Sequence, residues 1–376
     1  MLKYKLWGEL TMKIFMIGGT GLLGCEAAIE LIKMGHQVKS VALPPLPQGA
    51  PIPKEMELEF KDINKCSDAE VEEMLKGCDV FMYAAGVDER KECPPPVYEV
   101  YKKFNNDPLE RLLPICKKVG VKNAVVCGSY FSYMYKLAAG LTKNAANPDQ
   151  KIKYTGEEFL SHNPYIKSRI EQEKIVEKFC DDKFSASVLE LPYIFGVQPG
   201  RRPVWTILID QLSRMDKLPW TLYPAGGTAM LTCNQVGQAL AGAAVQKPGY
   251  GFRAIPIGMY NLTWKEFLAV VYDARGMAGR KIISIAPWMM KMGMKSVQKD
   301  YDKRGIESGM DPFQLPYTMD YNLFIDPTET KALGVKDADI KKAIFDSIDL
   351  SIKAVQGNVQ LVGMMGEVEK KEEKKN

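Results

Sequence analysis

Apolar and polar positions near the start of the chain follow first a strand-like and then a helix-like spacing. Residues 13–17 form a short apolar run that ends at glycines. Residues 25–34 then carry apolar side chains at helical spacing until Gly35. Residues 38–43 form a second strand-like run. Strand, helix and strand in this order predict one β-α-β unit.

The same alternation continues along the first half of the chain. It is typical of an α/β fold in which a doubly wound parallel sheet has helices on both faces and right-handed crossovers. Further strands are predicted at residues 56–60, 80–83, 123–127 and 187–191, and helices at 68–76, 98–118 and 165–179.

Beyond Gly196 this alternation breaks up. Clusters of proline and glycine separate amphipathic stretches, which indicates a smaller mixed region. The stretches cover residues 204–215, 236–245 and 264–275.

Composition and charge narrow the class of protein. The 376 residues are 46% hydrophobic and 26% charged, which is ordinary for a globular chain. The net charge of +4 comes from basic residues spread among a similar number of acidic ones, so nucleic acid is not an expected partner. The N-terminus lacks a secretory pattern and the chain has no long apolar run, so we expect a cytoplasmic protein without a membrane partner. Eight scattered cysteines and two histidines predict free thiols and no metal site.

Three glycines lie directly after the first predicted strand, at the start of the first helix. Gly18, Gly21 and Gly24 are three residues apart. This spacing permits a tight turn, close approach of the backbone to a pyrophosphate, and close packing of helix on sheet. The helix N-terminus adds free N–H groups and partial positive charge. The pattern predicts a Rossmann-type dinucleotide site.

Further motifs follow in a fixed order. They are Asp62-Ile63, Tyr83-Ala84-Ala85-Gly86, Asn106, Gly128-Ser129, 163–169 and 191–196. In this order the chain resembles the extended short-chain dehydrogenase/reductase superfamily, the NAD-dependent epimerase/dehydratase-like proteins, over about residues 12–345. The resemblance implies that cofactor-binding residues are Gly18, Thr20, Gly21, Leu22, Leu23, Gly24, Asp62, Ile63, Ala84, Ala85, Gly86, Asn106, Pro192, Tyr193 and Ile194.

The resemblance also divides the chain. We expect an N-terminal extension at 1–11, a Rossmann domain at 12–196, a substrate-binding region at 197–360 and a charged flexible tail at 361–376. We also allow for segments of the substrate-binding region that form part of the Rossmann core, and for the reverse.

The same resemblance implies a catalytic group of Ser129, Tyr165 and Arg169, with Tyr165 as acid/base and Ser129 orienting a carbonyl. Members of this superfamily carry Tyr-x-x-x-Lys, whereas Arg169 stands at the lysine position here. Arginine keeps the positive charge but does not lose its proton. Two hypotheses follow: an NAD(P)-dependent oxidoreductase or epimerase acting on a small molecule, or a catalytically weakened NAD(P)-binding sensor or scaffold. A second Tyr-x-x-x-Lys, at 98–102, lies too early in the chain and is interpreted as chance.

The cofactor form and the substrate stay open at this level. NAD users place an acid near the end of the second strand, but the chain has Ala42 there, and it offers no basic residue in its place. We therefore expect NAD or NADP. Arg201 and Arg202 could hold the diphosphate of a nucleotide sugar, while the methionine-rich segment 286–294 would equally suit an apolar ligand. A homodimer is also left open.

Overall fold

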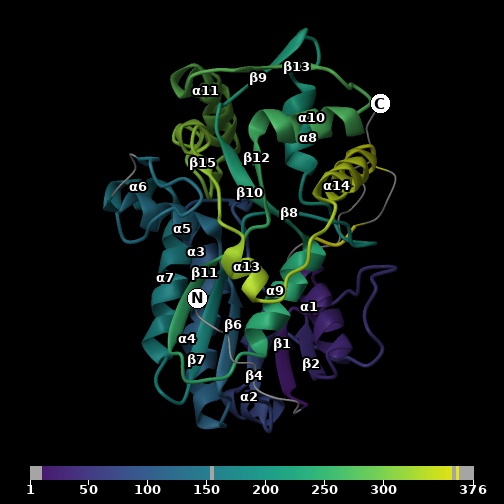
Figure 1. Ribbon diagram of the computed structural model, residues 1–376, viewed down its shortest axis with the longest axis vertical. Coiled ribbons are helices and arrows are strands. Elements are labelled where there is room, and N and C mark those ends of the chain that lie inside the picture. The colour runs from purple at the N-terminus through teal and green to yellow at the C-terminus, as the bar shows by residue number, and fades with distance from the viewer. Residues whose placement is uncertain (1–10, 153–155, 358–360, 364–376) are drawn as a thin grey trace.

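The computed structural model describes residues 11–152, 156–357 and 361–363. Most of the expected extension and tail therefore lies outside the described residues. The centre of the molecule is a seven-stranded sheet in which all neighbouring strands are parallel, and this confirms the doubly wound architecture (Figure 1). In spatial order the strands are β11 (Phe252–Pro256), β7 (Ser185–Glu190), β6 (Asn123–Cys127), β4 (Val80–Tyr83), β1 (Lys13–Ile17), β2 (Gln37–Ala42) and β3 (Glu57–Phe60).

Alternate residues of the central strands face two separate apolar cores, as the period of two in a strand requires. Ile14 and Met16 pack with helices α1 (Leu22–Lys33) and α9 (Cys233–Ala244) on one face. Phe15 and Ile17 pack on the other face, under helices α2, α4 and α7. These helices span Asp68–Leu75, Asp107–Lys118 and Pro164–Phe179.

The predicted helix at 98–118 is divided into three parts. Helix α3 (Tyr98–Tyr101) continues into a π-helical turn, η2 (Lys102–Asn106), and then into α4. A π-turn forms i→i+5 hydrogen bonds and so inserts an extra residue into the helical repeat. The faces presented by the residues of this turn therefore differ from those that a regular helix would give.

The expected boundary at residue 196 does not coincide with the edge of the sheet. Helix α9 lies beside α1, and β11 forms the edge of the sheet next to β7, although both follow residue 196 in sequence (Figure 1). Close approach of the two helices depends on Gly237, since a Cβ there would lie 2.6 Å from the Glu26 backbone. The parallel sheet and its helical layer are thus completed by residues from the C-terminal half.

The rest of the C-terminal half forms a third apolar core above the carboxyl edge of the sheet (Figure 1). Its main strand, β10 (Gly227–Thr232), pairs with β8 (Tyr193–Phe195), β12 (Tyr260–Thr263) and β15 (Asn322–Leu323). Strands β9 (Trp220–Tyr223) and β13 (Lys281–Ser284) form a separate pair. The helices packed on this core are α8 (Thr206–Ser213), α10 (Trp264–Ala274) and α14 (Ile340–Val355).

A pair of short strands joins the two halves of the chain. Strand β5 (Glu92–Cys93) pairs antiparallel with β14 (Glu307–Ser308). The remaining helices are η1 (Ile63–Lys65), α5 (Tyr130–Ala138), α6 (Glu157–His162), α11 (Pro287–Arg304), α12 (Leu315–Thr318) and α13 (Thr328–Ala332). In the part of the chain that the structure describes, none of the helices combines the length and apolarity needed to cross a membrane.

Candidate active site

The glycine turn between β1 and α1 has the geometry that its spacing predicts. Gly18 has φ of +93°, and a Cβ there would lie 2.7 Å from the Ala84 carbonyl oxygen. A Cβ at Gly24 would lie 2.3 Å from the Gly18 carbonyl oxygen. A side chain at either position would therefore collide with backbone. The turn is closed by a 2.9 Å hydrogen bond from the Gly21 N–H to the Gly18 carbonyl.

The N-terminus of α1 is open to a ligand. The helix starts at Leu22, its N-cap is Gly21, and no side chain caps it. The backbone N–H groups of the first helical turn, among them those of Leu22 and Leu23, have no partner within the helix and suit an anion. The arrangement fits a pyrophosphate.

Other residues predicted to bind the cofactor lie around this turn. Ala84, Ala85 and Gly86 directly follow β4, and Gly18 approaches the backbone of the first two. Pro192, Tyr193 and Ile194 lie where β7 passes into β8, at the same carboxyl edge of the sheet. Ligands of doubly wound sheets bind at this edge.

Asp62 and Ile63 lie at the end of β3. The Asp62 carboxylate accepts a 3.1 Å hydrogen bond from the Asn64 N–H and caps η1. Ile63 is buried in the apolar core on the α2 side of the sheet. Contact of this pair with an adenine stays a prediction.

Tyr165 is buried in an aromatic cluster at the start of α7. Its ring lies 5.3 Å from the ring of Tyr101 and 6.1 Å from that of Phe131, centroid to centroid. Only 3% of Tyr165 is exposed, and Ser129 is equally enclosed. The Ser129 hydroxyl oxygen caps α5 by accepting a 3.3 Å bond from the Phe131 N–H. The structure thus brings Ser129 and Tyr165 to one shielded place.

Arg169 follows Tyr165 by one turn of α7, with its guanidinium carbon 5.1 Å from the Tyr165 ring centroid. It donates hydrogen bonds to the carbonyl of Cys127 (3.2 Å), the side chain of Gln172 (3.0 Å) and the carbonyl of Val87 (3.2 Å). The guanidinium therefore joins the end of β6, helix α7 and the loop after β4. Its buried Nε has no hydrogen-bond partner among the described residues.

The charges around Tyr165 act in opposite directions. Burial raises the pKa of the phenol, whereas the Arg169 charge and the Ser129 hydroxyl lower it and the Glu89 carboxylate raises it again. The net result is a raised pKa, so Tyr165 carries its proton at neutral pH. In this state the phenol is a proton donor for a substrate oxygen.

Glu89 is a site residue that the sequence reasoning missed. It lies half-buried in the loop after β4. Burial and then the Asp88 carboxylate raise the pKa of Glu89 to about 7. Its charge in turn raises the pKa values of Tyr101, Tyr130 and Tyr193, three tyrosines of the aromatic cluster. An acid three residues after Gly86 was the available signal.

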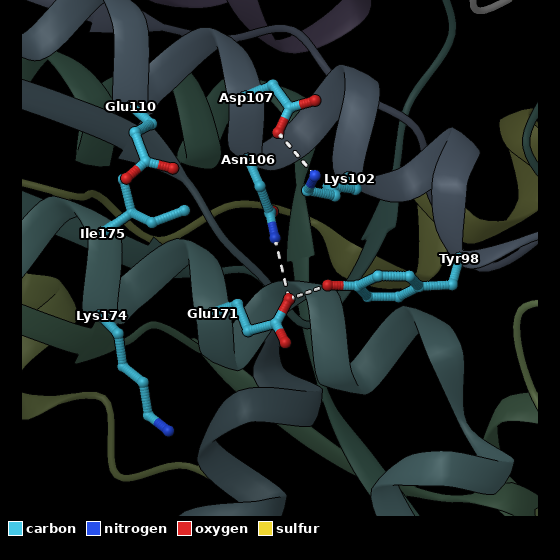
Figure 2. A pocket seen from close by; sticks show the side chains of 8 residues that line it. All are labelled: Tyr98, Lys102, Asn106, Asp107, Glu110, Glu171, Lys174 and Ile175. Carbon is cyan, nitrogen blue, oxygen red and sulfur yellow. Dashed lines mark hydrogen bonds and ion pairs between the residues drawn. The ribbon is translucent and has the colours of Figure 1, made fainter.

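Asn105, the neighbour of the predicted cofactor residue Asn106, holds the loop after β4. The Asn105 amide accepts from the Val87 N–H (2.8 Å) and donates to the Val87 carbonyl (3.0 Å). Asn106 instead donates to Glu171 at 3.3 Å, in a separate pocket of about 250 Å³ (Figure 2). Both residues belong to the π-turn, and their amides contact different elements. Contact of Asn106 with the cofactor stays a prediction.

The Tyr-x-x-x-Lys pair at 98–102 lines that same pocket. The Tyr98 hydroxyl donates to Glu171, and Lys102 forms a 3.8 Å ion pair with Asp107 (Figure 2). Burial and the Glu171 carboxylate raise the pKa of Tyr98, which disfavours a phenolate. These contacts support the interpretation of this pair as chance.

Lysines near the candidate site do not replace the missing family lysine. Lys136 of α5 forms ion pairs with Glu173 (3.0 Å) and Glu190 (2.9 Å). Lys167 lies over the Tyr98 ring, 4.5 Å from its centroid. Arg169 is therefore the cation that contacts Tyr165.

Comparison with known proteins identifies a family match. The model of the NAD dependent epimerase/dehydratase family matches residues 14–229. A comparison with curated proteins finds no match.

Solved structures share the fold. UDP-glucose 4-epimerase from Bifidobacterium longum, in complex with NAD+ and UDP, is 17% identical with a TM-score of 0.60, and the match covers 92% of this chain and 99% of that one. MoeE5, in complex with UDP-glucose and NAD, is 17% identical with a TM-score of 0.58 over 91% and 99% of the two chains. UDP-glucuronic acid 4-epimerase from Bacillus cereus, in complex with NAD, is 12% identical with a TM-score of 0.60 over 90% and 99%.

Replacing Arg169 by lysine tests the structural part of its role. The single ammonium group of a lysine cannot reproduce the planar set of guanidinium donors that reaches Cys127, Gln172 and Val87 together. We therefore expect Arg169→Lys to lower the free energy of unfolding by about 2–3 kcal/mol. Urea unfolding followed by circular dichroism measures this. Lys174→Arg, on the exposed face of the same helix, is the control. An unchanged unfolding free energy in Arg169→Lys would contradict the structural role of these three hydrogen bonds.

The two asparagines make a matched pair of variants. Asn105→Ala removes both bonds to Val87, so that the buried Val87 N–H loses its partner and the Val87 carbonyl keeps only the bond from Arg169. We therefore expect a loss of about 2–3 kcal/mol in unfolding free energy. Asn106→Ala removes one 3.3 Å bond at the pocket edge and should cost about 1 kcal/mol or less. Urea unfolding of both variants decides the assignment. A larger loss of unfolding free energy in Asn106→Ala than in Asn105→Ala would contradict the role of Asn105 in holding the loop.

Glu89 predicts a pH dependence of stability. Its folded pKa lies above its ordinary value of 4.5, so the folded chain holds this proton more tightly than the unfolded chain does. Stability from this group is therefore present below about 4.5 and is lost as pH rises through about 7. Glu89→Gln should gain stability over wild type by a few kcal/mol between about pH 5 and about pH 8. Glu99→Gln, at an exposed position, should show no such change. Urea unfolding at a series of pH values measures this. If the unfolding free energies of wild type and Glu89→Gln changed with pH in parallel, the assignment would be wrong.

Proposed function

Because the chain belongs to the NAD dependent epimerase/dehydratase family, we propose that it interconverts a hydroxyl and a carbonyl on a small-molecule substrate, with Tyr165 exchanging the proton. The family's cofactor is NAD. The observation that carries the proposal is the shielded contact of Tyr165 with the fixed positive charge of Arg169.

The residues present fit the dinucleotide. The glycine turn offers a cradle in which a Cβ at Gly18 or Gly24 would strike backbone, and the N-terminus of α1 faces it without a side-chain cap. The turn and the first N–H groups of α1 would hold the pyrophosphate, and the unpaired Nε of Arg169 is a donor for a ribose hydroxyl. When bound, NAD supplies the hydride acceptor of the reaction.

Tyr165 and its neighbours supply the proton chemistry. In the reducing direction the neutral phenol donates its proton to the substrate oxygen, and Arg169 then stabilises the phenolate that forms. In the oxidising direction this phenolate takes the proton back. Ser129 orients the substrate oxygen toward the phenol. Burial of all three groups excludes water, which strengthens the attraction between phenolate and guanidinium.

Arginine at position 169 limits what this site can do. A guanidinium does not release its proton at physiological pH, so Arg169 acts through its charge and cannot pass protons onward. The site therefore suits a reaction in which the same phenol proton is returned within a cycle. Epimerisation has that balance, since oxidation and reduction occur in succession.

A nucleotide sugar is the substrate class that we propose for the first assays. Several similar folds were solved with UDP or a UDP-sugar, among them the Bifidobacterium longum and MoeE5 structures. The third apolar core, which lies above the carboxyl edge of the sheet, adjoins the site through Tyr193. The rings of Tyr193 and Tyr130 pack with their centroids 5.9 Å apart.

Removing the Tyr165 hydroxyl tests the proposal. Tyr165→Phe should lower turnover by about 100-fold or more while NADH affinity stays within about threefold, because only the proton transfer is lost. Tyr133→Phe, whose hydroxyl bonds the Lys143 carbonyl at 3.5 Å outside the site, is the control. Absorbance at 340 nm and chromatography of UDP-sugar products provide the measurements.

Two outcomes would count against the proposal. Full activity in Tyr165→Phe would exclude this tyrosine as the acid/base. Wild-type protein that binds NADH but turns over no carbonyl or sugar substrate, with or without Arg169→Lys, would favour a nucleotide-binding sensor or scaffold.

A further inference from the structure

The segment that follows β8 turns back over the glycine turn. The Gln198 side chain donates a 3.2 Å hydrogen bond to the Thr20 carbonyl, and the Arg201 guanidinium donates a 3.0 Å bond to the same oxygen. Gly200 permits the approach of the loop after β2, since a Cβ there would lie 2.3 Å from the Gln48 nitrogen. An arginine from the C-terminal half is therefore fixed on the dinucleotide-binding turn.

The guanidinium of Arg201 contacts neutral acceptors. Besides the Thr20 carbonyl, it donates to the Gln198 side chain (2.8 Å) and to the Gly363 carbonyl (3.3 Å). Backbone bonds between Arg202 and Val362 and between Val362 and Gly200, at 3.1 and 2.9 Å, hold residues 361–363 alongside. These contacts position the cation but do not balance its charge.

Two other well-packed arginines have carboxylate partners, whereas Arg201, like Arg169, has none among the described residues. Arg275 pairs with Asp216 at 2.6 Å, and Arg90 pairs with Asp88. Burial lowers the pKa of Arg201, and the group that opposes this is the Cys25 thiol, whose own pKa is raised by burial to about 11. A desolvated cation without an anion is costly, and it binds an anion strongly when one is supplied.

Resting on the NAD-dependent function proposed above, we propose that Arg201 binds a phosphate group of the dinucleotide, so that a residue from the substrate half completes the cofactor site. The residue sits beside the open N-terminus of α1, and both features attract negative charge. Three of its five N–H groups donate to the described residues, which leaves two for a phosphate. The expected diphosphate role of Arg201 thus moves from a sugar nucleotide to the cofactor.

Two phosphates can meet this chemistry: the pyrophosphate of NAD and the 2'-phosphate of NADP. Pyrophosphate is expected, because the turn that Arg201 contacts is the pyrophosphate cradle. Adenosine carries neither group and reports binding of the base and ribose alone. ADP-ribose and 2',5'-ADP separate the two phosphates.

The test uses full-length Arg201→Met and Arg201→Lys, with Arg202→Met as control, since the Arg202 side chain is exposed. Calorimetric titration with NADH, NADPH, ADP-ribose, 2',5'-ADP and adenosine is the readout. We expect Arg201→Met to weaken NADH and ADP-ribose about 10- to 100-fold and adenosine less than about twofold. Arg201→Lys should recover part of the affinity, and the salt dependence of NADH binding should fall in Arg201→Met. Arg202→Met should match wild type within about threefold.

Thermal unfolding distinguishes a ligand role from a merely structural one. With the phosphate role, ligand-free Arg201→Met is as stable as wild type or more so, and the loss is confined to the stabilisation that NADH gives. A loss confined to 2',5'-ADP and NADPH would support the proposal with the 2'-phosphate as its source. Equal affinities of wild type and Arg201→Met for all ligands would overturn it while leaving the proposed function intact. Failure of wild type to bind any dinucleotide would overturn both.

Discussion

The Arg169 guanidinium is the constraint on which the candidate site depends. It bonds the Cys127 carbonyl at the end of β6 and the Val87 carbonyl in the loop after β4, while its own helix carries Tyr165. Two neighbouring strands and the tyrosine proposed to transfer the proton are thus held by one planar group. Because that group also lies beside the Tyr165 ring, the residue that fixes the geometry also sets the local charge. A lysine could supply the charge but not the fork. The departure from the family pattern is therefore explained by structure as well as chemistry.

The strand-and-helix order and the glycine turn could be predicted because they rest on local signals. The runs at 13–17, 80–83 and 123–127 match β1, β4 and β6 to the residue, since each is a continuous apolar run bounded by a turn. The return of β11 to the edge of the sheet could not be predicted, because pairing with β7 is a tertiary contact with no local pattern. The contact of the Asn105 amide with Val87 could not be predicted for a related reason: a π-turn looks like ordinary helix in sequence.

Charge at the site was harder still to predict than position. Arg201 stood out as a basic residue on a loop, yet only the fold shows that it lies on the Thr20 carbonyl. Arg169 and Arg201 are both enclosed cations near the proposed dinucleotide, and within the described ranges neither pairs with a carboxylate. They differ in what they contact. Arg169 lies against the Tyr165 ring, whereas Arg201 lies on the carbonyl of the glycine turn. This contrast is why the first is proposed for proton transfer and the second for phosphate.

The response of the site to pH follows from the same arrangement. In a Tyr-Lys pair both groups can titrate, whereas a guanidinium stays charged throughout the physiological range. The Tyr165 pKa is raised, so this phenol does not titrate near neutrality either. Within the cluster, the group whose pKa is placed at about 7 is Glu89, and its charge reaches Tyr165. A neutral-pH transition in this site would therefore belong to Glu89, because its ionisation adds a negative charge that makes the Tyr165 phenolate harder to form.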